Sequence, residues 1–389
     1  MANGDFQKFL VWGIVLSIPA GIASVTFPLY LQGLGISYAE IGAIFAIGPV
    51  LGLVLNYFVG THSDAVGRKA YLVLSSVLFS AYFIAIAFFT KSWEFTIASL
   101  LWSSYLAISS ASSGAYLSDI MPKNKRGQLA GRYNGIAGMA VVAAMALGGV
   151  LLLWLGYRNL FLVCALFGMF SVLLAMGFRE TVKKPKPKSG GRPSGISKAF
   201  DFGSIPWKIK FLFLVLLISN IAGQTITAFG FPLYFKHLGA DAGLIGFLIG
   251  FMWCGYYLSQ LFFGKFADRF HPGLLYASTF ALIIPVNVFL VFNQSPFAAA
   301  GVLFLQAAAF GLGSTAVTKM IFDSAGKNNG RDIAFVTNNA FIASVIGSFS
   351  GGLIMEHLGF SWIFAVRVVL FIICALLMIC FARKFQKSA

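Results

Sequence analysis

Long runs of apolar residues alternate with short polar segments along the whole chain. Each run is close to the ~20 residues that an α-helix needs to cross a bilayer. A window of about 19 residues moved along the sequence predicts twelve membrane-spanning helices. The expected spans are residues 9–31, 41–60, 70–90, 95–117, 133–155, 160–178, 211–235, 243–264, 274–292, 297–318, 333–355 and 361–381. The pattern therefore predicts an all-α integral membrane protein.

One connection is longer than the others and differs in composition. Residues 179–210 are rich in Lys, Pro, Gly and Ser, and such a segment is typical of a linker because it cannot bury an apolar core. We therefore expect two six-helix bundles, over residues 1–178 and 211–389, joined by a cytoplasmic linker over residues 179–210.

The composition excludes an ordinary soluble enzyme. Hydrophobic residues make up 59% of the chain and charged residues 10%, whereas a soluble domain has roughly 25% charged residues. The net charge of +16 would suggest a nucleic-acid partner in a soluble protein. Here 24 of the 28 basic residues lie in the tails, the linker and alternate loops, and four lie on the other side. The positive-inside rule then places both termini in the cytoplasm and makes the bilayer, not nucleic acid, the partner.

The two halves of the chain resemble each other at a fixed offset of 204 residues. The segment Phe27–Tyr30 recurs as Phe231–Tyr234, and Asp119 has Asp323 as its equivalent. Because six spans separate equivalent positions, the two halves have the same orientation and are related by an axis along the membrane normal.

The loop after the second span carries a motif. Gly60–Lys69 reads GTHSDAVGRK, and Gly264–Arg269 is a partial copy of it in the second half. A third element combines Asp119 with Arg126 after the fourth span. The first loop resembles the signature G-x-x-x-D-x-x-G-R-[KR] of the major facilitator superfamily, and the repeat and the twelve spans extend that resemblance over the whole chain.

The resemblance implies a gate on the cytoplasmic side. Asp64 is expected to contact the N-terminus of the eleventh helix, where amides without partners favour a carboxylate. Arg68 is expected to pair with Asp119, and Asp268 is expected to repeat the role of Asp64 at the start of span five. The expected gating residues are Gly60, Asp64, Gly67, Arg68, Lys69, Asp119, Arg126, Gly264, Asp268 and Asp323.

No acidic residue lies in the middle of a predicted span. Enzymes and metal sites in a membrane need acid–base pairs or ligand clusters, so we expect no catalytic residue, metal or cofactor. Transport coupled to protons or sodium usually relies on intramembrane carboxylates, so such coupling is not established. Residues 99–103 and 145–149 also lack the arginine and the Gly-Pro pair typical of drug/proton antiporters. Glu356 and Arg367, near the ends of the last two spans, are expected to form a structural pair.

The family resemblance implies a central cavity lined mainly by spans one, four, seven and ten. The candidate lining residues are Tyr30, Asn56, Trp102, Tyr105, Asn220, Gln224, Trp253, Tyr256, Tyr257, Gln306 and Asn338. Asn220 and Gln224 are four residues apart and share a helix face. The alternative is that these amides only join helices, with about 0.6 kcal/mol for each hydrogen bond.

A cavity with aromatic rings, neutral amides and no charge suits an uncharged or amphipathic solute. We expect a monomeric transporter of the cytoplasmic membrane that works by alternating access and exports lipophilic or amphipathic small molecules. The alternatives are an uptake carrier or uniporter for a neutral polar solute such as a sugar, lipid flipping, and a membrane scaffold that has kept the fold without transport.

Overall fold

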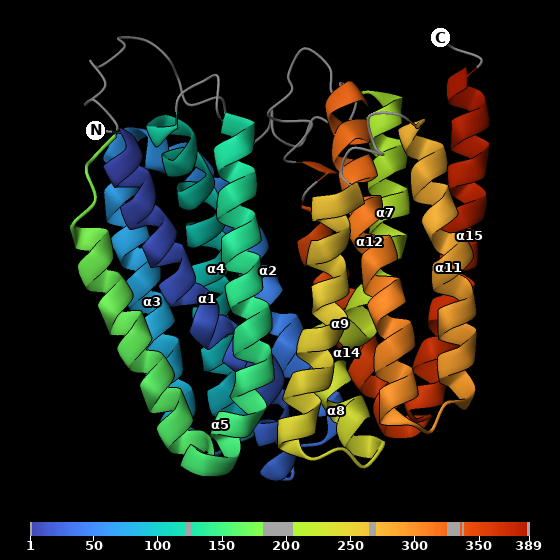
Figure 1. Ribbon diagram of the computed structural model, residues 1–389, viewed down its shortest axis with the longest axis horizontal. Coiled ribbons are helices and arrows are strands. Elements are labelled where there is room, and N and C mark those ends of the chain that lie inside the picture. The colour runs from blue at the N-terminus through green and yellow to red at the C-terminus, as the bar shows by residue number, and fades with distance from the viewer. Residues whose placement is uncertain are drawn as a thin grey trace.

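The computed structural model describes residues 2–121, 126–181, 205–263, 270–324, 335–336 and 338–386, with backbone alone for residues 2–3, 56–57, 60–66, 126–128, 130, 261, 263, 322–323 and 381–386. The secondary structure in these ranges is helical (Figure 1). The helices are α1 (Ala2–Gly33), α2 (Tyr38–Val66), α3 (Arg68–Phe88), α4 (Ser92–Ile120), α5 (Arg126–Met176), α7 (Trp207–Thr227), α8 (Gly230–His237), α9 (Ala242–Phe263), α11 (Pro272–Phe292), α12 (Pro296–Ser324), α14 (Asn339–His357) and α15 (Phe360–Gln386).

These helices confirm the twelve predicted spans once two breaks are taken into account. Helix α5 contains spans five and six, because Gly156 adopts φ 69° and ψ 167° and turns the chain between them. Helices α7 and α8 together form span seven, with Phe229 in a non-helical conformation between them. Ten helices of the described ranges are long and apolar enough to cross a membrane.

The helix bounds also confirm the internal repeat. Helices α3 and α11 begin and end 204 residues apart, and so do α4 and α12. The turns after spans one and seven use equivalent glycines, Gly35 and Gly239, with φ of 79° and 86°. The last turn of each half uses Gly156 and Gly359, so the offset shortens to 203 residues there.

Two bundles lie side by side in Figure 1, α1–α5 on the left and α7–α15 on the right. Both chain termini lie at the top of this view. We call this the termini end and the opposite end the far end. Across the interface α2 packs against α14, and α5 packs against α9.

The interface is tightest towards the far end, where backbones meet. A Cβ atom at Gly42 would lie 2.8 Å from the Cα of Gly352, and one at Gly246 would lie 2.7 Å from the carbonyl oxygen of Met145. Towards the termini end, the same helix pairs meet through side chains, such as Tyr257 against Gly138. A cavity of about 280 Å³ also opens there between α5, α9 and α12. The described residues therefore close the far end.

Both ends of the expected linker are packed rather than extended. Thr181 binds the end of α4, and Glu180 binds the start of α3. At the other end, α7 begins at Trp207 and Ile209 is fully buried, because its first turn already belongs to the apolar core of the second bundle. Residues 182–204 lie outside the described ranges.

Candidate functional site

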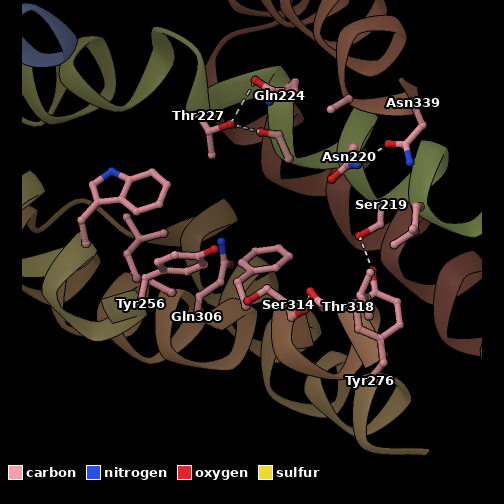
Figure 2. Close-up of a pocket in the computed structure, with 18 of the residues that line it drawn as sticks. Ser219, Asn220, Gln224, Thr227, Tyr256, Tyr276, Gln306, Ser314, Thr318 and Asn339 are labelled. Atoms are coloured by element: carbon pink, nitrogen blue, oxygen red, sulfur yellow. Dashed lines mark hydrogen bonds between the residues drawn. The ribbon is translucent and has the colours of Figure 1, made fainter. Parts of the chain in front are cut away.

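A cavity of about 590 Å³ lies within the second bundle, between α7, α9, α11, α12 and α14 (Figure 2). Apolar side chains and aromatic rings form most of its wall. Its polar lining residues are Ser219, Asn220, Gln224, Thr227, Trp253, Tyr256, Tyr276, Gln306, Ser314, Thr318 and Asn339. Among the residues that the structure describes, none that lines it carries a formal charge.

One wall of the cavity combines α7 with the start of α14. The amide of Asn220 donates to Asn339 Oδ1 at 2.5 Å, and the Asn339 amide donates in turn to the Val336 carbonyl. Thr227 donates to the Gly223 carbonyl at 3.0 Å and lies 3.4 Å from Gln224 Oε1. These bonds fix the amide of Asn220 in the wall, and Gln224 lines the same cavity beside Thr227 (Figure 2).

The opposite wall is one face of α12. Gln306, Phe310, Ser314 and Thr318 recur every four residues and therefore share that face. From behind, the amide of Asn287 donates to Gln306 Oε1 at 2.7 Å. This bond occupies the oxygen of Gln306 and leaves its NH₂ group as a donor for a ligand.

A hydrogen bond between α11 and α7 forms part of the cavity wall. The hydroxyl of Tyr276 donates to Ser219 Oγ at 3.0 Å, and both residues are buried. The lining thus offers aromatic faces and a few neutral hydrogen-bonding groups, a combination that orients an uncharged organic molecule.

A smaller cavity of about 240 Å³ is lined mostly by the first bundle, with Gln224, Ala228 and Ser344 from the second. Its wall includes Trp102 and Tyr82, whose rings lie 4.9 Å apart. Gln224 of α7 lines this cavity as well as the larger one. The Gln224 side chain therefore lies between the two cavities.

The structure brings five of the eleven candidate lining residues to the large cavity: Asn220, Gln224, Trp253, Tyr256 and Gln306. Trp102 lines the smaller cavity, and Tyr257 lines the cavity between the bundles.

The other candidates lie elsewhere. Tyr30 donates to the Phe89 carbonyl at 2.9 Å, and Tyr105 is buried with its ring 4.7 Å from that of Phe79. Asn338 stands at the N-cap of α14, and its neighbour Asn339 lines the cavity instead. The side chain of Asn56 lies outside the described residues.

Six polar lining residues are not among the eleven candidates: Ser219, Thr227, Tyr276, Ser314, Thr318 and Asn339. Four of them are Ser or Thr, which are common in helix packing and carry little information alone. Ser314 and Thr318 follow Gln306 by eight and twelve residues, multiples of four, and so share its face of α12. This spacing was a usable signal.

An ion pair and a hydrogen bond join α3, α4 and the start of the linker at the termini end. Arg68 Nε lies 2.9 Å from Asp119 Oδ2, with side chains 15% and 31% exposed. The hydroxyl of Thr181 donates to the same carboxylate oxygen at 2.8 Å. The contact expected between Arg68 and Asp119 is therefore present, while its role in gating stays a prediction.

Glu180 caps the N-terminus of α3. Its carboxylate accepts hydrogen bonds from the backbone amides of Arg68 and Lys69, at 3.0 and 3.2 Å. Gly67 permits this approach, because it has φ 115° and a Cβ there would lie 2.5 Å from Glu180 Oε2. A carboxylate at a helix N-terminus satisfies amides without partners and interacts favourably with the helix dipole.

The side chains of the other expected gating residues lie outside the described residues. The backbones of Gly60 and Asp64 belong to α2, that of Arg126 to α5 and that of Asp323 to α12. Gly264 and Asp268 lie outside the described residues.

At the far end, the expected pair of Glu356 and Arg367 is wrong. Glu356 Oε2 accepts a hydrogen bond from the backbone amide of Tyr38 at 2.8 Å and so links α14 to the start of α2. Arg367 is fully buried within the second bundle. The two residues lie on helices joined by a tight turn, but their side chains point to different surroundings. Within the described ranges, no group of three or more His, Cys, Asp or Glu residues is arranged to hold a metal ion.

The comparisons with known proteins agree with this architecture. The family model of the Major Facilitator Superfamily matches residues 10–239 and 212–388. An uncharacterized MFS-type transporter of Methanocaldococcus jannaschii is 23% identical over 377 residues, which cover 94% of this chain and 97% of that protein. The multidrug resistance protein MdtG of Citrobacter koseri is 25% identical over 358 residues, 88% of this chain and 87% of MdtG.

Solved structures share the fold. The inward-facing, unoccupied structure of a bacterial homolog of the human lysosomal transporter Spinster superposes with a TM-score of 0.79, at 15% identity over 99% of this chain and 98% of that one.

Proposed function

Since the chain belongs to the major facilitator superfamily, whose members are membrane transporters and not enzymes, we propose that it exports neutral lipophilic or amphipathic molecules across the cytoplasmic membrane. The multi-pass helical structure fits a protein of that membrane. The similarity to MdtG, a multidrug resistance protein, supports export at the level of a distant relative.

The observation that carries the proposal is the cavity of about 590 Å³, whose described lining residues carry no formal charge. A phosphate or dicarboxylate would need basic side chains in the wall, and the described part of the lining includes none. Aromatic residues such as Trp253 and Tyr256 offer apolar contact area, and the amides of Gln224 and Gln306 offer a few oriented hydrogen bonds.

The proposed cycle is alternating access between the two bundles. The basic tails and loops support a cytoplasmic termini end under the positive-inside rule. The close contact of Gly42 with Gly352 then closes the outer side. In the opposite state, the loop around Arg68 and Asp119 is proposed to help close the cytoplasmic side.

The experiment is the accumulation of labelled chloramphenicol, a neutral amphipathic compound, in cells that lack their own efflux pumps. Cells with the wild-type chain are expected to accumulate less than cells with Gln224→Ala, because that variant removes a cavity amide. Gln7→Ala is the matched control, since Gln7 is exposed at the termini end of α1. Equal accumulation in cells with and without the chain would contradict export of this class of compound.

A second candidate is uptake of a neutral polar solute such as a sugar. The amides and hydroxyls of Asn220, Thr227 and Asn339 along one wall favour it, since such groups bind hydroxyl-rich molecules. Labelled sugar entering cells faster with the wild-type chain, in an assay where chloramphenicol accumulation does not change, would favour uptake.

A further inference from the structure

Arg367 is the one charged residue among the buried side chains of the described ranges. It lies on α15 and has an exposed fraction of 0%. Its three guanidinium nitrogens have no hydrogen-bond partner in the described part of the chain. An ionisable side chain inside a membrane bundle is costly and is by default a candidate for function.

Two aromatic rings of the same helix lie beside this guanidinium. Its central carbon lies 5.5 Å from the centre of the Phe371 ring and 5.9 Å from that of Phe364. Cation–π contact of this kind stabilises the charge without neutralising it. Glu356, the acidic residue expected to balance Arg367, binds the amide of Tyr38 instead.

The charge lies close behind the wall of the large cavity. The ring of Phe371 is 5.8 Å from that of Phe310, and Phe310 lines the cavity. The ring of Phe371 thus lies between the guanidinium and Phe310 of the cavity wall. Aromatic and aliphatic side chains have a low dielectric constant, so the field of a buried charge reaches across such a layer with little screening.

We infer that Arg367 makes the cavity select neutral and anionic lipophilic molecules against lipophilic cations. The inference deepens the proposed function, on which it rests. The lining residues within the described ranges hold no carboxylate that would offset the positive potential. At this range, a unit charge in a protein interior changes the affinity for a charged ligand by about tenfold or more.

The test uses two probes of nearly equal shape and opposite charge, tetraphenylborate and tetraphenylphosphonium, with triphenylmethanol as a neutral probe. Binding to the full chain in detergent is measured for the wild type, Arg367→Lys and Arg367→Met. The variant Gln306→Trp fills the cavity, so only the binding that it abolishes counts as cavity binding. This correction removes partitioning of the probes into detergent.

The wild type and Arg367→Lys are expected to bind the borate at least about tenfold more tightly than the phosphonium. Arg367→Met, which keeps a long side chain but removes the charge, is expected to lose most of that preference. An equal preference in Arg367→Met would overturn the inference. So would a wild type that binds the phosphonium as tightly as the borate, a result that does not depend on any variant at position 367.

The neutral probe separates this inference from the proposed function. Cavity binding of triphenylmethanol without any preference between the ions rejects the charge selection alone. No cavity binding of any of the three probes rejects both the selection and the proposed function.

Discussion

The two bundles share one repeat but use the space between their helices differently. At the 204-residue offset, Trp102 of the first bundle corresponds to Gln306 of the second, and Phe83 corresponds to Asn287. The rings in the first bundle fill the space, with Trp102 4.9 Å from Tyr82. In the second bundle, Gln306 and Asn287 bind each other and leave room for the larger cavity.

The same contrast holds on the first helix of each half. Leu16 corresponds to Asn220, and Ala20 to Gln224. Leu16 is buried in the apolar core of its bundle, whereas Asn220 faces the cavity. The comparison teaches that a repeat preserves the helix framework while single substitutions decide which half holds the larger cavity.

The last helix of each half also differs. Counted from the equivalent glycines Gly156 and Gly359, Arg367 has Cys164 as its counterpart. Both positions are fully buried. The second bundle therefore carries a positive charge where the first carries a small neutral side chain.

The largest expected effect comes from exchanging the residues that differ. Gln306→Trp copies the first bundle into the second and should reduce binding of a neutral lipophilic compound by at least about tenfold, because the ring occupies the cavity. The reverse exchange, Trp102→Gln, should lower the free energy of unfolding by about 3 kcal/mol, because it removes a packed ring. Ligand titration and thermal unfolding measure the two effects. Unchanged binding in Gln306→Trp would mean that the ligand binds elsewhere.

A smaller effect is expected where the two bundles touch. Gly42→Val should separate α2 from α14 at the far end, since even a Cβ there would lie 2.6 Å from the Ser348 carbonyl oxygen. The substitution Ser344→Cys adds a thiol to the wall of the smaller cavity. Opening the far end should increase the rate at which a reagent added on that side alkylates this thiol by about fivefold.

Gly114→Val is the matched control for this experiment, because no atom outside its own helix lies within 4 Å of a Cβ there. Equal rates of alkylation in Gly42→Val and Gly114→Val would show that the glycine contact does not close the far end.

The smallest effect on stability is expected at the termini end. Asp119→Asn removes the charge that pairs with Arg68 and should change the free energy of unfolding by less than about 1 kcal/mol, because the pair is partly exposed. Its initial rate of transport should fall about twofold if the pair stabilises one state of the cycle. Asp323→Asn, at the equivalent position in the second half, should change the rate less. A larger loss of transport rate in Asp323→Asn than in Asp119→Asn would mean that Asp323, and not Asp119, matters more for gating.

The sequence predicted the framework well because hydrophobic length and repetition determine it. The twelve spans and the equivalence of α4 with α12 followed from apolar runs and one offset. Family resemblance also led to the contact of Arg68 with Asp119. Glu180 was missed because its carboxylate binds backbone amides, and a sequence does not show which amides lie free beside it.

The lining of the cavity was harder to predict, since residue type does not tell a lining ring from a filling one. Tyr105 and Tyr256 look alike in sequence, yet one is packed against Phe79 and the other lines the cavity. Hydroxyl residues are ambiguous for another reason. Ser314 donates to the Gly311 carbonyl of its own helix, so its position in a span does not imply a ligand.

The most direct measurement is the melting temperature of the purified chain with a panel of neutral lipophilic compounds and sugars, for the wild type and Gln306→Trp. A ligand that binds the folded state alone raises the melting temperature. The proposed function predicts a rise with at least one lipophilic compound in the wild type and none in Gln306→Trp. A rise with sugars alone, or an equal rise in both proteins, would contradict a lipophile site in the second bundle.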